Sequence, residues 1–129
     1  MNRVLLYTLA CALAAAPLAA CSGAPGPESV VEMYLQAVLA NDEVRAVNLS
    51  CASWEAQARA EGRSFEGVEA SLEGLSCAAD EIDRQTTQVN CVGRIVYSYG
   101  GGENKKVDLA SRSFTVVLEG ELWRMCGYE

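Results

Sequence analysis

The feature that most constrains the fold of this chain is a change in the spacing of its apolar residues near Gly67. Before this residue the apolar positions recur every three or four residues, which is typical of helices that bury one face. After it they alternate with polar residues, which is typical of strands in a half-buried sheet. A block of helices followed by a block of strands predicts one α+β domain, which we place at residues 28–129.

The helical block divides at Asn41-Asp42. A first helix is expected from Pro27, because proline suits the first helical turn. Asn41 can end that helix in the left-handed conformation, and Asp42 can cap the next one. The second helix is expected to reach Gly62, with a break near Ser53, so the block holds two or three helices. Its apolar stripe consists of Val44, Val47, Cys51, Trp54 and Ala58.

The strand block predicts four antiparallel strands. The first begins at Val68, and its alternation slips at Gly74, which indicates a β-bulge. If Asp83-Arg84-Gln85 forms the first turn, Cys77 lies directly opposite Cys91. The third strand is expected over roughly residues 107–118, and the fourth over residues 121–128.

Four cysteines of this domain predict a disulfide framework. Opposite positions on paired strands lie about 4.5 to 5.5 Å apart at Cα, within disulfide range, which favours Cys77–Cys91. Cys51 and Cys126 then remain for a second bridge, although four cysteines permit three pairings. A four-cysteine zinc site is disfavoured, because the chain has no Cys-x-x-Cys pair and no histidine. We therefore expect no metal and no cofactor.

The N-terminus predicts export. Residues 1–20 combine an early Arg3 with an uncharged apolar run, as secretory signal peptides do. The run ends in Leu18-Ala19-Ala20-Cys21, which resembles a bacterial lipobox; that resemblance implies cleavage before Cys21 and a lipid on its thiol. The alternative is ordinary cleavage that leaves a free thiol, but lipidation leaves an even number of cysteines. We expect residues 21–27 to be a lipidated cysteine and short linker.

This N-terminus and the charge of the chain together predict its surroundings. The expected location is extracytoplasmic, with the chain lipid-anchored to a bacterial membrane, either the outer face of the cell membrane or the outer membrane. The chain has 17 acidic and 10 basic residues, for a formal net charge of −7. Such a chain is repelled by nucleic acid, so we expect no nucleic-acid partner.

The stretch VVEMYLQAVLANDEVRAVNL and the ending EGELWRMCGYE resemble the nuclear transport factor 2-like superfamily, most closely its small exported versions on bacterial lipoproteins. The resemblance implies two or three N-terminal helices packed on a curved four-stranded antiparallel sheet, a cystatin-like arrangement that often encloses a pocket. Many members dimerise through the outer face of the sheet. The superfamily includes dehydratases, isomerases and binding modules, so the fold does not choose among them.

The absence of histidine excludes histidine-based acid–base chemistry. The acidic residues are expected at helix starts, turns and outward positions, namely Asp42, Asp80, Asp83, Glu103 and Glu119. We therefore favour a non-catalytic module that binds a small apolar ligand or an envelope protein. The alternative is an isomerase or dehydratase that uses a carboxylate and a tyrosine in the pocket. The aromatic candidates for the pocket, which could equally be core residues, are Tyr34, Trp54, Tyr97 and Tyr99.

A candidate interface follows from the last hairpin. Pairing across Glu119-Gly120 places four apolar residues on one sheet face: Phe114, Val116, Trp123 and Met125. If Cys126 faces the helices to reach Cys51, this apolar face points outward and is a candidate homodimer or partner surface. The alternative is that the face belongs to the core and that the Cys51–Cys126 bridge forms at the sheet's edge.

Overall fold

The structure, a computed structural model, describes residues 23–129. The predicted signal peptide and Cys21 lie outside the described residues. The helical elements are α1 (Pro27–Leu39), α2 (Glu43–Asn48), the 3-10 turn η1 (Ala52–Trp54) and α3 (Glu55–Glu61). The later elements are β1 (Val68–Glu81), β2 (Thr86–Tyr99), β3 (Lys105–Asp108), the 3-10 turn η2 (Leu109–Ser111), β4 (Ser113–Glu119) and β5 (Leu122–Tyr128). None of the helices within this part of the chain is long and apolar enough to cross a membrane.

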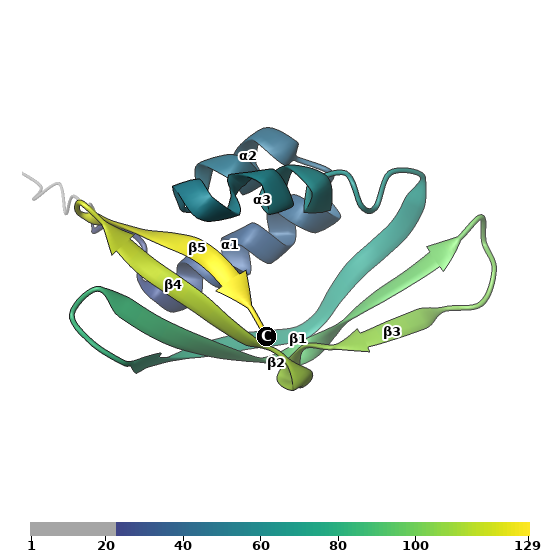
Figure 1. The fold of residues 1–129 in the computed structure, drawn as a ribbon. Helices are drawn as coiled ribbons and strands as arrows, with labels where there is room; N and C mark the ends of the chain where they lie inside the picture. The colour runs from purple at the N-terminus through teal and green to yellow at the C-terminus, as the bar shows by residue number, and fades with distance from the viewer. Residues whose placement is uncertain (1–22) are drawn as a thin grey trace, which may run out of the picture.

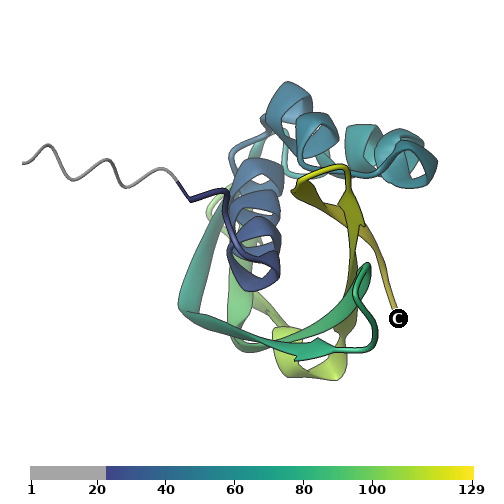
Figure 2. The same ribbon diagram turned by 90° about the vertical axis from the view of Figure 1, so that its left-hand side faces the viewer.

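The curved sheet wraps around the helices. Figure 1 shows α1 lying in the concave face of the sheet, with α2 and α3 above it. In Figure 2 the β1–β2 hairpin and the β4–β5 hairpin stand on either side of α1, so the sheet encloses the helix from more than one direction. This is the expected α+β arrangement of three helices packed on an antiparallel sheet.

Local signals in the sequence set the ends of the helices. Pro27 occupies the first turn of α1, where its missing N–H costs no hydrogen bond. Asn41 adopts the left-handed conformation, with φ of 55°, and ends the first helical segment. Asp42 caps α2 by accepting a hydrogen bond from the backbone N–H of Arg45 at 3.0 Å.

The second predicted helix is divided into α2, η1 and α3. The placement of Val44 on its apolar stripe was wrong, since Val44 is 71% exposed. The chain leaves the helix after Asn48 and restarts at Ala52, so one continuous stripe cannot describe both halves. Instead, α2 packs through Ala46 and α3 through Ala58, which are both fully buried.

The β1–β2 hairpin has the predicted turn and register. The side chain of Asp83 accepts hydrogen bonds from the backbone N–H groups of Gln85 and Thr86, at 2.7 and 2.8 Å. Cys77 lies opposite Cys91, and their Cα atoms are 4.1 Å apart. This spacing is close to that of a non-hydrogen-bonded pair in an antiparallel ladder. The two cysteines form a disulfide.

The register of this hairpin shifts between Glu73 and Ser76, which confirms the bulge predicted at Gly74. The bulge requires a second glycine on the partner strand. Gly93 has φ of 107°, and a Cβ placed there would lie 2.7 Å from the carbonyl oxygens of Glu73 and Gly74. Because a bulge bends its strand, this pair of glycines contributes to the curvature around α1.

The sheet has five strands instead of the predicted four. Its order is β1-β2-β4-β5, and β3 also pairs with β2. The predicted third strand is interrupted by η2, where the side chain of Asp108 accepts a hydrogen bond from the backbone N–H of Ala110 at 2.9 Å. Such Asx turns compete with strand pairing. The interruption places Leu109 in the core, where it is fully buried.

Of the two orientations considered for the apolar face of the last hairpin, the outward one is wrong. Phe114, Val116 and Met125 are fully buried among the core residues, and Trp123 is half-buried against the same core. This face packs toward the helices and is not available as a partner surface. The alternative interpretation holds, because Cys51 bonds Cys126 at the edge of β5 that faces away from β4.

Backbone hydrogen bonds, as well as the disulfide, hold this edge of β5. The N–H of Cys51 donates to the carbonyl of Met125 at 2.8 Å, and the N–H of Met125 donates to the carbonyl of Leu49 at the same distance. The segment before η1 therefore continues the sheet in a short parallel bridge. The outer face of the β1–β2 hairpin is largely polar and includes an ion pair between Arg94 and Glu73.

Candidate ligand-binding site

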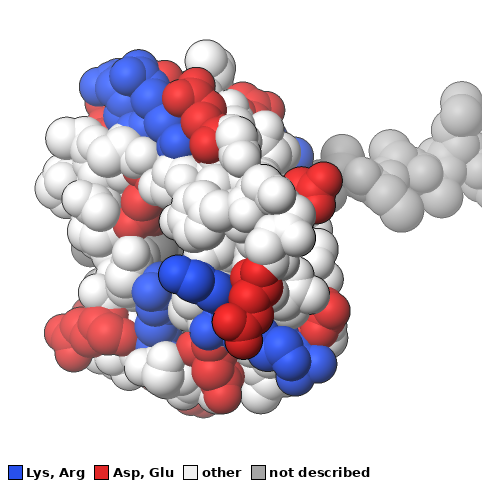
Figure 3. Space-filling model, turned by 90° about the vertical axis from the view of Figure 1, so that its right-hand side faces the viewer, with Lys and Arg blue, Asp and Glu red and all other residues white. Residues whose placement is uncertain are grey.

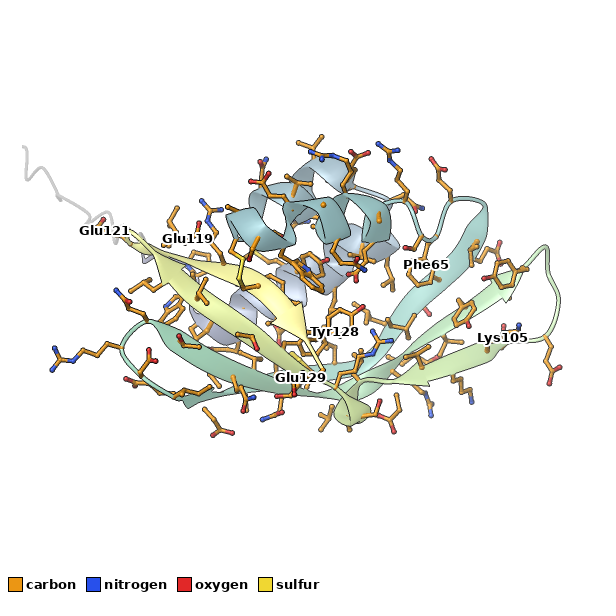
Figure 4. The ribbon with its side chains drawn as sticks, viewed as in Figure 1. Phe65, Lys105, Glu119, Glu121, Tyr128 and Glu129 are labelled. Atoms are coloured by element: carbon orange, nitrogen blue, oxygen red, sulfur yellow. A yellow bond between two sulfur atoms is a disulfide. The ribbon has the colours of Figure 1, made fainter. Side chains whose placement is uncertain are left out.

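A cavity of about 200 Å³ lies between the helices and the sheet. Figure 3 shows a hollow on the face that carries the β2–β3 hairpin, with acidic and basic side chains near its rim. In Figure 4, Phe65 from the loop after α3 and Tyr128 from the end of β5 lie on two sides of this region. The lining residues on the helical side are Tyr34, Leu35, Val38, Glu61, Ser64 and Phe65. Those on the sheet side are Ile95, Val107, Arg112 and Tyr128.

The polar centre of the cavity is the carboxylate of Glu61, the last residue of α3. The hydroxyl of Tyr34 donates to its Oε2 at 2.6 Å, and the hydroxyl of Tyr128 donates to its Oε1 at 2.7 Å. The side-chain amide of Gln57 donates to Oε1 at 3.1 Å. Three donors on one carboxyl group describe an acceptor-only carboxylate whose oxygens are largely engaged.

The two tyrosines are held in their neutral form. Burial raises the pKa of Tyr34 far above its ordinary value, and the hydrogen bond to Glu61 raises it further. Burial also raises the pKa of Tyr128, again with a contribution from Glu61. Deprotonation of either hydroxyl would place a second negative charge beside the carboxylate, which explains why Glu61 raises the pKa of both tyrosines.

The positive group of the cavity is Arg112, which directly follows η2. Its guanidinium carbon lies 4.7 Å from the centre of the Tyr128 ring, in a cation–π arrangement. The rest of the wall is mostly aliphatic and aromatic. The cavity can therefore accommodate an apolar body, with polar recognition confined to the carboxylate, the two tyrosine hydroxyls, the Ser64 hydroxyl and the guanidinium.

Of the four aromatic residues predicted for the pocket, only Tyr34 lines this cavity. Trp54 does not line the cavity; its indole N–H donates a hydrogen bond to the Tyr34 hydroxyl at 3.2 Å. Tyr97 packs edge-on against Phe65, with ring centres 6.0 Å apart. Tyr99 is 60% exposed and lies outside the cavity, because β2 extends beyond the helices at this end.

Four polar lining residues, Glu61, Ser64, Arg112 and Tyr128, were not predicted. The sequence contains a signal for the first: Trp54, Ala58 and Glu61 follow the i, i+4, i+7 spacing of one helix face. The expectation that acidic residues lie at helix starts, turns and outward positions does not cover Glu61, which ends α3. Arg112 had no such signal, since its position depends on the interruption by η2 within the expected strand.

The Cys51–Cys126 disulfide joins the two segments that carry Trp54 and Tyr128, the aromatic residues beside Tyr34 and Glu61. Cys51 immediately precedes η1, which contains Trp54, and Cys126 belongs to β5, which contains Tyr128. The Trp54 and Tyr128 rings are 5.6 Å apart in an edge-on arrangement. Within residues 23–129, no group of three or more His, Cys, Asp or Glu side chains is arranged to hold a metal ion.

No family model and no curated protein matches the chain. Several solved structures do. A candidate scytalone dehydratase from Novosphingobium aromaticivorans superposes with a TM-score of 0.53 at 13% identity, over 76% of this chain and 75% of the other. The protein Aln2 from a Streptomyces species gives 0.53 at 15% identity, over 82% and 91%.

A nuclear transport factor 2-like protein of unknown function from Shewanella oneidensis gives a TM-score of 0.50 at 10% identity, over 75% of this chain and 88% of the other. At these identities the likeness shows the fold alone. Together with the three helices and the antiparallel sheet, it identifies the fold as nuclear transport factor 2-like.

Proposed function

We propose that this nuclear transport factor 2-like domain is a lipid-anchored, extracytoplasmic module that binds a small, mostly apolar molecule in its cavity without transforming it. The observation that carries this proposal is the state of Glu61. The polar centre of the cavity is a carboxylate already bound by Tyr34, Tyr128 and Gln57. Such a group fixes the shape of the cavity, and a substrate would have to compete with these three donors for its oxygens.

The tyrosines support the same conclusion. An efficient general acid has a pKa near the working pH, whereas the pKa values of Tyr34 and Tyr128 are raised away from it. Both hydroxyl protons also point to Glu61. A substrate would have to displace an existing hydrogen bond before it could receive either proton.

The size of the cavity limits the ligand. Pockets for drug-sized molecules usually have volumes of about 300 to 1,000 Å³. This cavity has about 200 Å³. Since an apolar cavity of about 150 Å³ can hold benzene, one ring with a short substituent, or a branched chain of similar size, matches the space.

The proposed location rests on two features. Disulfides persist in oxidising compartments, and the two bridges of this domain indicate an extracytoplasmic environment. The sequence Leu18-Ala19-Ala20-Cys21 and the Gly- and Pro-containing linker add the proposal of a lipid anchor at Cys21. Two or more acyl chains on one residue would hold the domain stably at a bacterial membrane.

A second candidate function is an isomerase or dehydratase. The observation that favours it is a carboxylate within 2.6 and 2.7 Å of two tyrosine hydroxyls inside a cavity, because such a group could exchange a proton with a bound substrate. A structural neighbour described as a candidate scytalone dehydratase is compatible with this chemistry. In this reaction Glu61 would be the base and a tyrosine the acid.

One experiment separates the two functions. The full chain, purified in detergent, is incubated with a panel of single-ring alcohols, ketones and acids, and both binding and chemical change are measured. We expect binding with every compound recovered unchanged. Glu61→Gln should alter binding, whereas Glu55→Gln, an exposed change on the same helix, should not.

Turnover that Glu61→Gln abolishes and Glu55→Gln preserves would overturn the binding module in favour of the enzyme. Failure of the entire panel to bind or react would contradict both functions.

A further inference from the structure

We propose that the ligand of this cavity carries a carboxylate group and that Arg112 binds it. This inference rests on the proposed binding function and adds the chemical class of the ligand. It is carried by a half-buried guanidinium that lines an apolar cavity without an anionic partner among residues 23–129.

The other arginines in the folded domain show how unusual this position is. Arg59 and Arg63 form ion pairs with Glu43, and Arg94 pairs with Glu73. The half-buried Arg124 donates to the backbone carbonyl of Asn48. Arg45 and Arg84 are exposed, so water solvates them.

Arg112 differs because it is half-buried and its observed partner, Tyr128, is a neutral side chain that it contacts at the ring and at the hydroxyl. A guanidinium that is partly removed from water loses hydration free energy, and a ring replaces only part of it. An anion from solvent would restore charge-assisted hydrogen bonds at the wall of the cavity.

The Tyr128 ring also orients Arg112. The guanidinium carbon lies 4.7 Å from the ring centre, so the ring covers one side of the group. This leaves an edge for a carboxylate, which accepts two parallel hydrogen bonds from arginine. The orientation exists before the ligand arrives, so less conformational entropy is lost on binding.

The acidic residue of the cavity does not fill this role. Glu61 is the one carboxylate among the lining residues, and it forms no ion pair with Arg112. Its oxygens are engaged by the two tyrosines and Gln57. The guanidinium of Arg112 is thus the group that can bind an anion, and the carboxylate of Glu61 is a fixed hydrogen-bond acceptor within the protein.

Benzoate and benzamide form a matched pair of probes. Each has one ring, consistent with the cavity volume of about 200 Å³, and they differ chiefly in charge. Binding of each to the full chain in detergent is measured by calorimetry at pH 7, with blanks of the same detergent. We expect benzoate to bind at least about tenfold more tightly than benzamide, as a charge-assisted hydrogen bond predicts.

Two variants assign the preference to its residue. Arg112→Gln should abolish the advantage of benzoate while benzamide still binds, which shows that the cavity is intact. Arg112→Lys should retain part of the advantage, because a point charge remains without the planar edge. Arg84→Gln, in the exposed β1–β2 turn, should behave as the wild type.

The outcomes separate this inference from the function on which it rests. Equal binding of the two probes to the wild type, or an unchanged preference in Arg112→Gln, would overturn the carboxylate inference and leave the binding module standing. If neither probe binds but uncharged members of the larger panel do, the carboxylate inference fails alone. If no compound of the panel or the pair binds, the proposed function fails with it.

Discussion

Removal of the Cys51–Cys126 disulfide should destabilise the domain more than removal of Cys77–Cys91. The cysteines of the first bridge are 75 residues apart in the sequence, and those of the second are 14 residues apart. By the chain entropy of the unfolded state, closing loops of these lengths contributes about 4.5 and about 3 kcal/mol. Against a typical domain stability of about 5 to 15 kcal/mol, the first loss is a large fraction.

Burial does not separate the two bridges, so loop length alone decides the comparison. Each bridge joins one cysteine that is 2% exposed, Cys51 or Cys91, to one that is half-buried, Cys126 or Cys77, so truncation removes similar buried contact from both. We therefore expect Cys51→Ala/Cys126→Ala to lose about 1.5 kcal/mol more than Cys77→Ala/Cys91→Ala.

The assay is unfolding in guanidinium chloride, followed by tryptophan fluorescence. Free energies extrapolated to water are compared instead of midpoints, because loss of a crosslink also changes the surface exposed by the unfolded chain and hence the slope. The wild type under reducing conditions, which loses both bridges, should be less stable than either double variant. An equal or larger loss on removal of the shorter loop would refute the reasoning from loop length.

Further predictions concern the network, the bulge and the anchor. Tyr34→Phe should cost about 1 to 3 kcal/mol in urea unfolding, because Glu61 loses a donor in a buried setting. Because folding raises the pKa of Tyr34, the contribution of its hydroxyl to the free energy of unfolding is complete below about pH 10 and is progressively lost above it. Above this pH the wild type should therefore lose up to about 1.4 kcal/mol of stability per pH unit more than Tyr34→Phe does. Parallel profiles of stability against pH for the two proteins would contradict this. In the same urea assay, Gly93→Ala should cost at least about 2 kcal/mol of stability. Gly101→Ala, where a Cβ meets open space, should cost about 1 kcal/mol. Similar losses in the two variants would argue against the close approach of Gly93 to the backbone of the bulge. Cys21→Ser should move the protein from the membrane fraction to the soluble fraction, and retention in the membrane would exclude the proposed anchor.

The parts of the fold that the sequence predicted are those with local causes. Asn41 and Asp42 end one helix and cap the next through their own conformations and side chains. Asp83 builds the first hairpin turn from two hydrogen bonds with its neighbours, and this turn sets the register that brings Cys77 opposite Cys91.

The errors concern properties that local sequence does not determine. Alternation showed correctly that Phe114, Val116 and Met125 share a face, because side chains on a strand point to opposite sides in turn. It could not show which face the helices would cover, and that choice depends on the packing of the entire sheet. The interruption at Leu109 likewise exchanges strand pairing for burial of one side chain in a core formed by distant residues.

The candidate site was the least predictable part, since its polar residues come from the end of α3, the segment after η2 and the end of β5. Spacing along the chain carries no direct information about such a meeting. Tyr34 was recognised because it lies on the apolar face of one regular helix. Glu61 lies on a similar stripe, but its carboxylate suggested exposure, and only its three donors account for its place in the cavity wall.

The same arrangement links the compartment of the protein to the shape of its cavity. The Cys51–Cys126 bridge joins β5 to the segment that leads into Trp54. From Trp54, hydrogen bonds continue to the Tyr34 hydroxyl and on to Glu61, which Tyr128 reaches from β5. The disulfide and the hydrogen bonds therefore close a ring through α1, α3 and β5, and a reduced chain would have to hold that ring by non-covalent contacts alone. Since Tyr128 also orients Arg112, the cation that we propose binds the ligand depends on a crosslink that is maintained only in an oxidising environment.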